Sequence, residues 1–264
     1  MGVRNGIYWL SLAGGGLVLT FLLYPLLHAF LTTDPSLLAY SFRDGEVVAS
    51  LVTSFKTAAM AAATATITGV PFAYLLARRD FRGKGLLEGI INLPVVIPHT
   101  VAGILLLMAV SPRTRLGSLL QRAGVEFIES SAGITTAMLF VSFPLLINAA
   151  RDAFARVPVR LEEVARTLGA GPLAVFFTVT LPLAWRGVLT GIILTWARAV
   201  SEFGAVVILA YHPLTAPVLI YERFQSHGLA RAQPIAVLLL MVSLVVFVLV
   251  RLAAGGESSY VKRH

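Results

Sequence analysis

The apolar residues of this 264-residue chain come in blocks of about twenty, separated by short polar connections. A helix needs roughly 20 apolar residues to cross a hydrocarbon core about 30 Å thick. Six segments meet or approach this length, and the predicted spans are residues 7–31, 50–77, 86–110, 133–150, 187–210 and 234–252. Because these blocks are apolar on every face, they predict membrane helices and not strands of alternating polarity. With 57% apolar and 13% charged residues, the chain is expected to be an all-α integral membrane protein.

The first block follows Arg4 and invites comparison with a signal peptide. Its apolar run is longer than the 7–15 residues typical of a signal peptide, and no Ala-x-Ala cleavage site follows it in residues 31–40. We therefore expect residues 7–31 to remain as a span.

Lysine and arginine are distributed unevenly between the connections. Thirteen of the 21 lie on one side of the predicted spans and six on the other. Cytoplasmic connections carry the excess of positive charge, so both termini are expected in the cytoplasm. The net charge of +8 is then a signal of topology and not of nucleic-acid binding. Residues 255–264 are polar and led by glycine, which predicts a loose cytoplasmic tail.

One cytoplasmic connection, residues 151–186, has a pattern of its own. After Pro158, a residue suited to the first position of a helix, apolar residues recur at the spacing i, i+3, i+4 and i+7. They are Leu161, Val164, Ala165 and Leu168. This spacing predicts a short amphipathic helix with one apolar stripe and with Glu162, Glu163 and Arg166 on its other faces.

A second short helix is expected to follow the first. Gly169 and Gly171 are suited to end the first helix, and Pro172 can open another that runs through Pro182. An amphipathic helix of this kind either lies on lipid headgroups or fits a groove on another protein. The stripe is small and has no Trp or Phe to anchor it in lipid, which favours the protein groove.

This connection resembles the EAA loop of permease subunits of ATP-binding-cassette importers, written E-A-A-x3-G-x9-I-x-L-P. The matching residues are Glu163-Val164-Ala165, Gly169 and Val179-Thr180-Leu181-Pro182, with Val164 in place of Ala and Val179 in place of Ile. In that family the loop is a coupling helix that docks into a cleft on a cytoplasmic ATPase. The resemblance implies that this docking segment consists of Arg160, Leu161, Glu162, Glu163, Val164, Ala165, Arg166, Thr167, Leu168, Gly169, Ala170 and Gly171. Glycine at 169 suits a tight reversal, because a Cβ resists the left-handed conformation.

Three other runs are similar to the molybdate, tungstate and sulfate branch of these permeases. They are residues 93–98 (LPVVIP) followed by Gly103, residues 197–204 (ARAVSEFG) and residues 217–223. The resemblance implies the type I importer permease fold, with six transmembrane helices in residues 1–254 and a cytoplasmic coupling loop at 151–186. It also implies that the substrate is an oxyanion. Molybdate or tungstate is favoured, and sulfate and phosphate remain open.

The chain carries no P-loop. The only Gly-Lys pair is Gly83-Lys84, which has Arg78 at the required glycine position and Gly85 in place of the hydroxyl residue. ATP and Mg are therefore expected on a separate ATPase chain, with no cofactor or metal on this one. No protease motif occurs and the five histidines share no metal-ligand spacing, so a transport subunit is expected and not an enzyme.

Polar residues inside the predicted spans are candidates for the translocation path. Arg198 and Glu202 lie at i and i+4, so they can pair, either as a structural ion pair or as a polar wall of the path. Pro94 and Pro98 are expected to interrupt the third span, as a packing kink or as a hinge that lines the path. The full candidate set is Pro94, Pro98, His99, Thr100, Arg198, Ser201 and Glu202. His99 and Thr100 are expected to be polar residues with hydrogen-bond partners within the protein, in preference to ligands of a bound ion.

The expected assembly follows from the resemblance. Six spans are few to enclose a gated pore, and two-fold dimers are the commonest homo-oligomers. We expect two copies of this chain in the bilayer of a prokaryotic cytoplasmic membrane, with two ATPase subunits below, one extracytoplasmic solute-binding protein above, and no nucleic acid. The small residues Ala61, Ala65 and Gly69 predict close helix packing, within the subunit or across the dimer. The alternative is an ATP-independent secondary transporter or channel subunit for a small anion, which would purify without an ATPase.

Overall fold

The computed structural model describes residues 2–255, and every regular element in them is helical. The long helices are α1 (Gly2–Thr32), α3 (Gly45–Arg78), α7 (Ser131–Ala155), α10 (Leu181–Val200) and α13 (Leu229–Gly255). The shorter elements are α2 (Pro35–Arg43), α4 (Lys84–Val96), α5 (His99–Val110), α6 (Arg115–Arg122), α8 (Val159–Thr167), α9 (Pro172–Val175), the π-helical turn η1 (Phe176–Thr180), α11 (Gly204–Leu209) and α12 (Ala216–His227). The predicted all-α class is confirmed.

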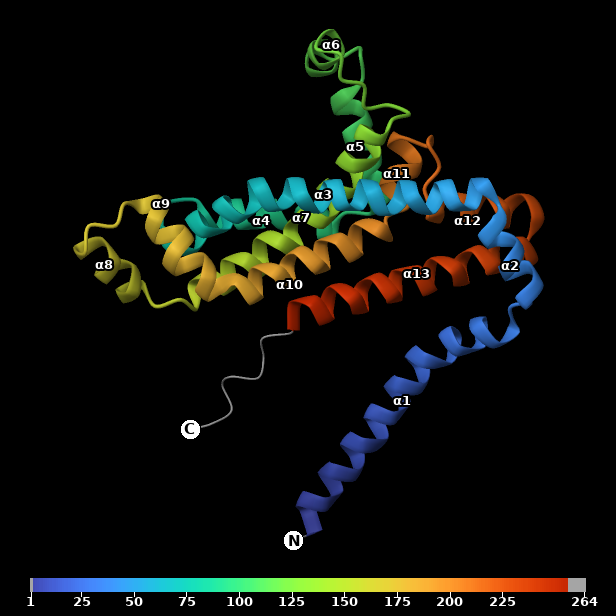
Figure 1. Cartoon of the computed structure of the whole chain (residues 1–264), viewed down its shortest axis with the longest axis horizontal. Helices are drawn as coiled ribbons and strands as arrows, with labels where there is room; N and C mark the ends of the chain where they lie inside the picture. The colour runs from blue at the N-terminus through green and yellow to red at the C-terminus, as the bar shows by residue number, and fades with distance from the viewer. Residues whose placement is uncertain (1, 256–264) are drawn as a thin grey trace.

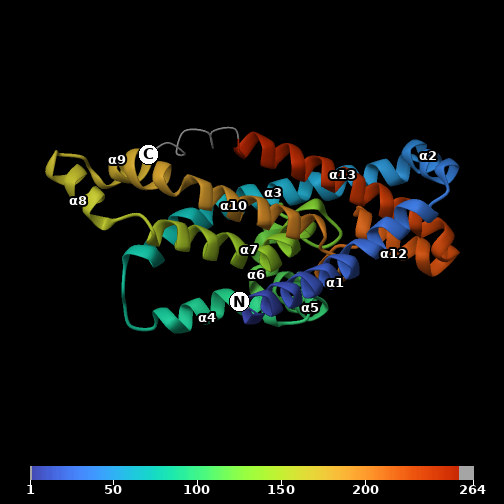
Figure 2. The ribbon, with the colours of Figure 1, turned by 90° about the horizontal axis from the view of Figure 1, so that it is seen from below.

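Helices α3, α7 and α10 form the centre of a bundle and run side by side in Figure 1. The short helices α8 and α9 lie at one end of this bundle, which we call the α8 end, and α2 and α12 lie at the opposite end, the α2 end. Figure 2 shows α13 on one side of the bundle and α4 on the other, where α4 packs against α7. Helix α5 projects from the side of the bundle and carries the short α6 at its far end (Figure 1).

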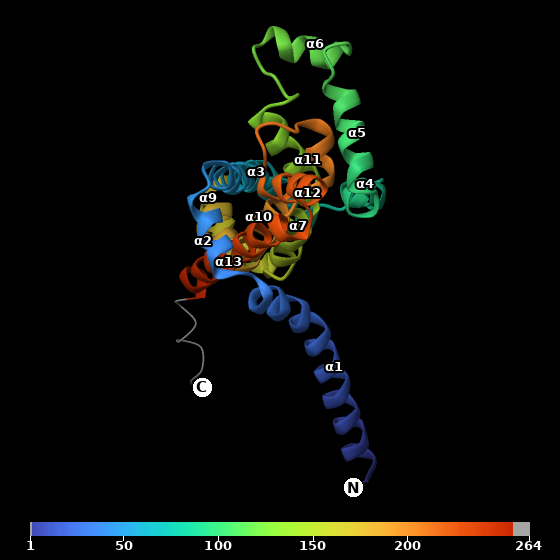
Figure 3. The ribbon, with the colours of Figure 1, turned by 90° about the vertical axis from the view of Figure 1, so that its right-hand side faces the viewer.

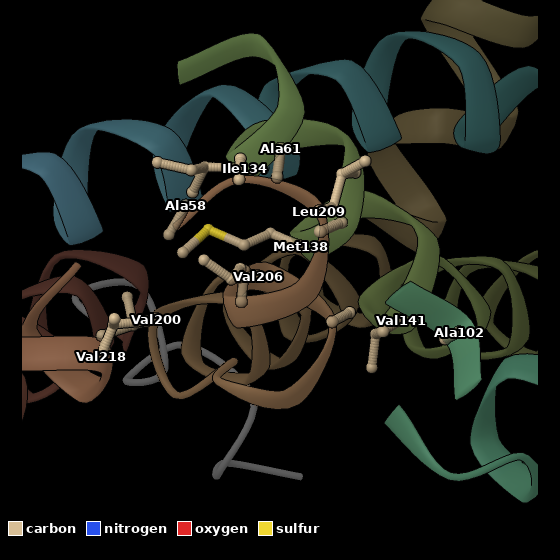
Figure 4. Close-up of a cluster of buried hydrophobic side chains, with 14 residues drawn as sticks. Ala58, Ala61, Ala102, Ile134, Met138, Val141, Val200, Val206, Leu209 and Val218 are labelled. Carbon is tan, nitrogen blue, oxygen red and sulfur yellow. The ribbon is translucent and has the colours of Figure 1, made fainter. Parts of the chain in front are cut away.

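Small residues of α3 let it approach α7 closely. Ala61 and Ala65 are fully buried, and a Cβ added to Gly69 would lie 3.2 Å from Cδ2 of Leu146 on α7. Figure 4 shows the core that forms here, in which Ala58 and Ala61 face Ile134 and Met138. The predicted ridge of small residues therefore packs within the subunit.

Five described helices are long and apolar enough to cross a membrane, and the bent pair α4 and α5 makes a sixth if it counts as one span. The spans predicted at residues 7–31, 50–77, 133–150 and 234–252 correspond to α1, α3, α7 and α13. The other two predicted spans differ from the structure.

The third predicted span, residues 86–110, is bent by 112° between α4 and α5. Ile97 ends α4 in an extended conformation (φ −75°, ψ 143°), as expected for a residue that precedes proline. Pro98 therefore breaks the span. Pro94 lies inside α4, whose helix continues past it, so the expectation that both prolines interrupt the helix is wrong for Pro94.

The fifth predicted span, residues 187–210, begins too late and ends too late. Helix α9, η1 and α10 continue into one another, so the apolar helix runs over Pro172–Val200. Residues 172–182 are thus the start of this span and not a separate short helix. At the other end residues 201–203 leave the helix, and the chain resumes as the short α11.

Helix α1 leans away from the bundle (Figures 1 and 3). Its main contact with the body is to α13, where the side-chain amide of Gln233 donates to Oγ1 of Thr32 (3.0 Å). Of the predicted tail, Gly255 is the last residue of α13, and 256–264 lie outside the described residues.

Candidate functional site

The first candidate site is the loop between α7 and α10 at the α8 end (Figure 1). After α8 the chain reverses at Gly169, which has a φ of +90°. The N–H of Gly169 donates to the carbonyl of Arg166, and the N–H of Ala170 donates to that of Ala165, both at 3.0 Å. This pair of hydrogen bonds closes a helix whose next residue is left-handed. The structure therefore confirms why glycine suits position 169.

The side chain of Glu162 points from α8 into the bundle and is only 1% exposed. Its Oε1 accepts hydrogen bonds from Nε of Arg78 (2.8 Å) and from the hydroxyl of Thr180 (2.8 Å). Its Oε2 accepts from the hydroxyl of Tyr74 (3.1 Å) and, at 3.4 Å, from Arg166. We call Glu162, Tyr74, Arg78 and Thr180 the Glu162 cluster. It ties α8 to the end of α3 and to the turn that opens α10.

The environment of Glu162 favours the ionised carboxylate. Burial acts to raise the pKa of Glu162, but the hydrogen bonds from Arg78 and Thr180 and the charge of Arg78 outweigh it, so this pKa lies below its usual value. A buried charge without a partner would cost several kcal/mol. The ion pair and hydroxyl donors are therefore what allow an acidic side chain to hold the loop from inside.

The opposite face of α8 is apolar and exposed. Leu161, Val164 and Leu168 are 44%, 50% and 84% exposed. The predicted stripe exists and faces away from the bundle, and the side chain of Glu162 points inward. Glu162, which the resemblance places in the docking segment, therefore adds no exposed side chain to it, because its carboxylate is enclosed by this chain.

The remaining docking residues are accessible. Arg160, Glu163, Arg166, Thr167, Gly169 and Gly171 are exposed, and Ala165 and Ala170 are partly exposed. Except for Glu162, the segment that the sequence singles out thus forms one accessible surface at the tip of the α8 end.

The second candidate site lies where the α4–α5 bend meets the end of α10. Nη2 of Arg198 donates to Oε2 of Glu202 (2.7 Å) and lies 2.7 Å from Nδ1 of His99. Nδ1 of His99 is 3.1 Å from the same carboxylate oxygen, and Oε1 of Glu202 accepts from the N–H of Ala205 (2.8 Å). Nη1 of Arg198 donates weakly to Oγ of Ser201 at 3.3 Å. We call His99, Arg198, Ser201 and Glu202 the polar cluster.

Two glycines allow the start of α5, after the Pro98 bend, to lie close to the start of α11. A Cβ at Gly204 would lie 2.9 Å from Cβ of His99, and a Cβ at Gly103 would lie 2.8 Å from the carbonyl oxygen of Ala205. Both distances are too short for a real Cβ contact. The backbones of α5 and α11 therefore approach closely enough to bring His99 to the α10 side chains.

The structure brings together four of the seven candidate path residues. Thr100 follows His99 at the start of α5 and is exposed, and Pro98 forms the bend beside them. Pro94 is separate: it lines an apolar cavity of about 340 Å³ between α4 and α7. The predicted ion pair of Arg198 and Glu202 is present, and His99 is hydrogen-bonded as expected.

Several polar partners were missed by the sequence reasoning. Tyr74, Arg78 and Thr180 hold Glu162, and the only hint was that Thr180 falls inside the Val-Thr-Leu-Pro run. The side chain of Asn148 on α7 donates to that of Asn92 on α4 (2.7 Å). Within residues 2–255, no group of three His, Asp or Glu side chains could hold a metal ion.

Comparisons with known proteins cover nearly the whole chain. Residues 69–255 match the family described as "Binding-protein-dependent transport system inner membrane component". The chain is 41% identical to the molybdate/tungstate transport system permease protein WtpB of Pyrococcus abyssi, over 98% of this chain and 100% of that protein. It is 38% identical to the molybdenum transport system permease protein ModB of Escherichia coli K12, over 75% of this chain and 90% of that protein.

Solved structures share the fold at low sequence identity. A chain of a bacterial ABC transporter involved in the import of the acidic polysaccharide alginate aligns with a TM-score of 0.76 at 15% identity, over 97% of each chain. A chain of the MetNI methionine ABC transporter in an inward-facing conformation aligns with a TM-score of 0.62 at 17% identity, over 82% of this chain and 96% of that one.

Proposed function

The chain belongs to the family of binding-protein-dependent transport system inner membrane components, and we propose that it is the permease subunit of an ATP-driven oxyanion importer. Molybdate or tungstate is the substrate that the names of its relatives support. The chain is an integral membrane transport component and not an enzyme. Hydrolysis of ATP supplies the energy for uphill import. Because this chain has no P-loop, ATP and Mg are bound on a separate ATPase chain.

The observation that carries the proposal is the two-sided α8. Its apolar face, formed by Leu161, Val164 and Leu168, is exposed at the tip of the bundle, while Glu162 holds the helix from inside. An apolar ridge rimmed by charged residues suits a groove on a partner protein. The partner is the ATPase, and residues 160–171 other than Glu162 form the docking surface.

The assembly contains two copies of this chain, two ATPase subunits at the α8 end and one extracytoplasmic solute-binding protein at the α2 end. The α8 end faces the cytoplasm, because it carries the excess of arginine and lysine. Both termini then lie on the cytoplasmic side of a prokaryotic cell membrane. ATP-driven closure of the ATPases draws the two α8 loops together and converts the bundles from inward-open to outward-open.

Transport itself is tested with the reconstituted assembly. Vesicles that contain the permease, the ATPase and the binding protein are supplied with ATP, and uptake of tungstate, molybdate and sulfate is measured by mass spectrometry. We expect ATP-dependent accumulation of tungstate or molybdate in preference to sulfate. Uptake that continues unchanged without ATP would favour the ATP-independent transporter, which has no support from the relatives above.

Docking is tested separately by co-purification in mild detergent. Gly169→Pro cannot adopt the φ of +90° at the end of α8, and Glu163→Lys reverses a charge on the exposed surface. Both variants are expected to lose the ATPase while the spans still insert. Glu126→Lys makes the same charge change at an exposed position before α7 and is expected to retain the ATPase. Normal recovery of the ATPase with both loop variants would contradict the docking surface.

A further inference from the structure

We propose that Arg198 and His99 form a transient subsite for a tetrahedral oxyanion on the translocation path, and that Glu202 keeps it weak by competing for the same donors. The inference rests on the proposed function, because it takes the transported oxyanion as the ligand. The inference assigns a ligand, a tetrahedral oxyanion, to the polar cluster and explains why the cluster contains a carboxylate.

The polar cluster exposes its nitrogen donors and hides its carboxylate. The side chains of Arg198 and His99 are 25% and 39% exposed, whereas that of Glu202 is 1% exposed. A guanidinium carries five N–H donors, and the contacts of Arg198 use Nη2 and, weakly, Nη1. The Nε–H finds no acceptor among the described residues. An anion that reaches the cluster therefore meets free and partly used N–H groups and the exposed hydroxyl of Ser201 before the carboxylate of Glu202.

Glu202 is fixed in place as an internal competitor. Its Oε2 accepts a hydrogen bond from Arg198 and lies 3.1 Å from Nδ1 of His99. Its Oε1 accepts a hydrogen bond from the backbone N–H of Ala205 at the start of α11. Because the carboxylate is buried and held by the backbone, it cannot swing away when another anion arrives. The donors then offer an oxyanion only part of their charge. Weak binding is what a transport site needs, since it must release its substrate.

The polar cluster lies beside a contact between α10 and α3. The ring of Trp196, two residues before Arg198, is 5.8 Å from the ring of Phe55. Phe55 is ten residues from the start of α3 at Gly45, a length of about 15 Å along a helix. The cluster therefore sits inward of the α2 end, where α5 and α11 join the bundle (Figure 1). An oxyanion delivered at this end would reach it early on its way through.

The experiment uses the absence of cysteine from the chain. Thr100→Cys places one thiol beside His99, and the complex of permease and ATPase in nanodiscs, without binding protein, is treated with N-ethylmaleimide. Tungstate is expected to slow modification at least fivefold relative to sodium chloride of equal ionic strength. Ser118→Cys on α6, where Ser118 is partly exposed, is the matched control and is expected to react at the same rate with and without tungstate.

Two variants then test the roles of the charges. Arg198→Gln in the Thr100→Cys background is expected to abolish the protection. Glu202→Gln keeps the shape and the acceptor for Ala205 but removes the competing charge, and it is expected to lower the half-protecting tungstate concentration about tenfold. Ser201→Cys is a second reporter if Thr100→Cys does not assemble with the ATPase.

The outcomes separate this inference from the proposed function. Equal modification rates with and without tungstate, protection that survives Arg198→Gln, or equal slowing at Ser118→Cys would overturn the subsite. An unchanged or higher half-protecting concentration with Glu202→Gln would overturn the competitor role. If the unaltered complex imports tungstate in vesicles while these results are negative, only the subsite fails. Absence of ATP-driven uptake by the unaltered complex would instead count against the proposed function.

Discussion

Leu168→Ala is predicted to weaken ATPase binding without disturbing the permease. Leu168 is 84% exposed at the end of α8, so its side chain makes few contacts within this chain. The substitution removes three carbon groups, and each buried CH₂ contributes about 0.8 kcal/mol. If the ATPase covers this side chain, each loop loses about 2 kcal/mol, which raises the dissociation constant about 30-fold.

The assay is a titration of labelled ATPase against permease in nanodiscs, read by fluorescence anisotropy. Leu119→Ala is the matched control, because Leu119 is 64% exposed on α6, away from the α8 end. Thermal unfolding of the permease alone should be the same for both variants and for the unaltered chain. ATPase affinity of Leu168→Ala within twofold of that of Leu119→Ala would refute the assignment of the apolar face as the docking surface.

Three further predictions concern the stability of the permease chain itself. Gly169→Ala is expected to destabilise the end of α8 by about 1–2 kcal/mol, because alanine resists the left-handed backbone conformation. No clash contributes, since nothing lies within 4 Å of the added Cβ. Hydrogen exchange of the loop amides measures this loss of stability. Glu162→Gln is expected to loosen the loop by about 3 kcal/mol near neutral pH. Since the folded pKa of Glu162 is lowered, its contribution is present above the unfolded pKa and lost as pH falls through the folded pKa, so exchange protection of the unaltered loop should decline in acid and that of Glu162→Gln should not. Gly103→Ala is expected to destabilise the α5–α11 contact by about 1–3 kcal/mol, because its Cβ meets the carbonyl of Ala205; unchanged unfolding in detergent would contradict this.

The spans that the sequence predicted well are those whose apolar run coincides with one uninterrupted helix, such as α7 and α13. The other two failed for a local reason. Residues 86–110 and 187–210 are mainly apolar and contain few charges, so hydropathy alone could not reveal where the helix breaks inside them. Pro98 was a visible signal for the first, but nothing in the composition showed that Ser201 ends α10.

The burial of Glu162 shows a second limit. The periodicity of α8 correctly predicted a short helix with an apolar stripe, and the small size of that stripe favoured a groove on another protein. The sequence did not show that Glu162 turns inward, because its partner Arg78 is 84 residues away and a local window does not contain it. A reversed amphipathic helix is stable only where an ion pair compensates the buried charge and where something else covers the apolar face.

Helix α10 connects the two candidate sites. Thr180, directly before it, donates to the carboxylate of Glu162, and Arg198, near its other end, donates to that of Glu202. Its twenty residues span about 30 Å, the thickness of the hydrocarbon core. A displacement of α8 that preserves the Thr180 hydrogen bond therefore moves the start of the helix that carries Arg198. Because Glu202 is also tied to the backbone of α11, movement of α10 changes the distance between the donors of the polar cluster and the α5 bend. The proposed docking surface and the proposed anion subsite are thus linked through one helix.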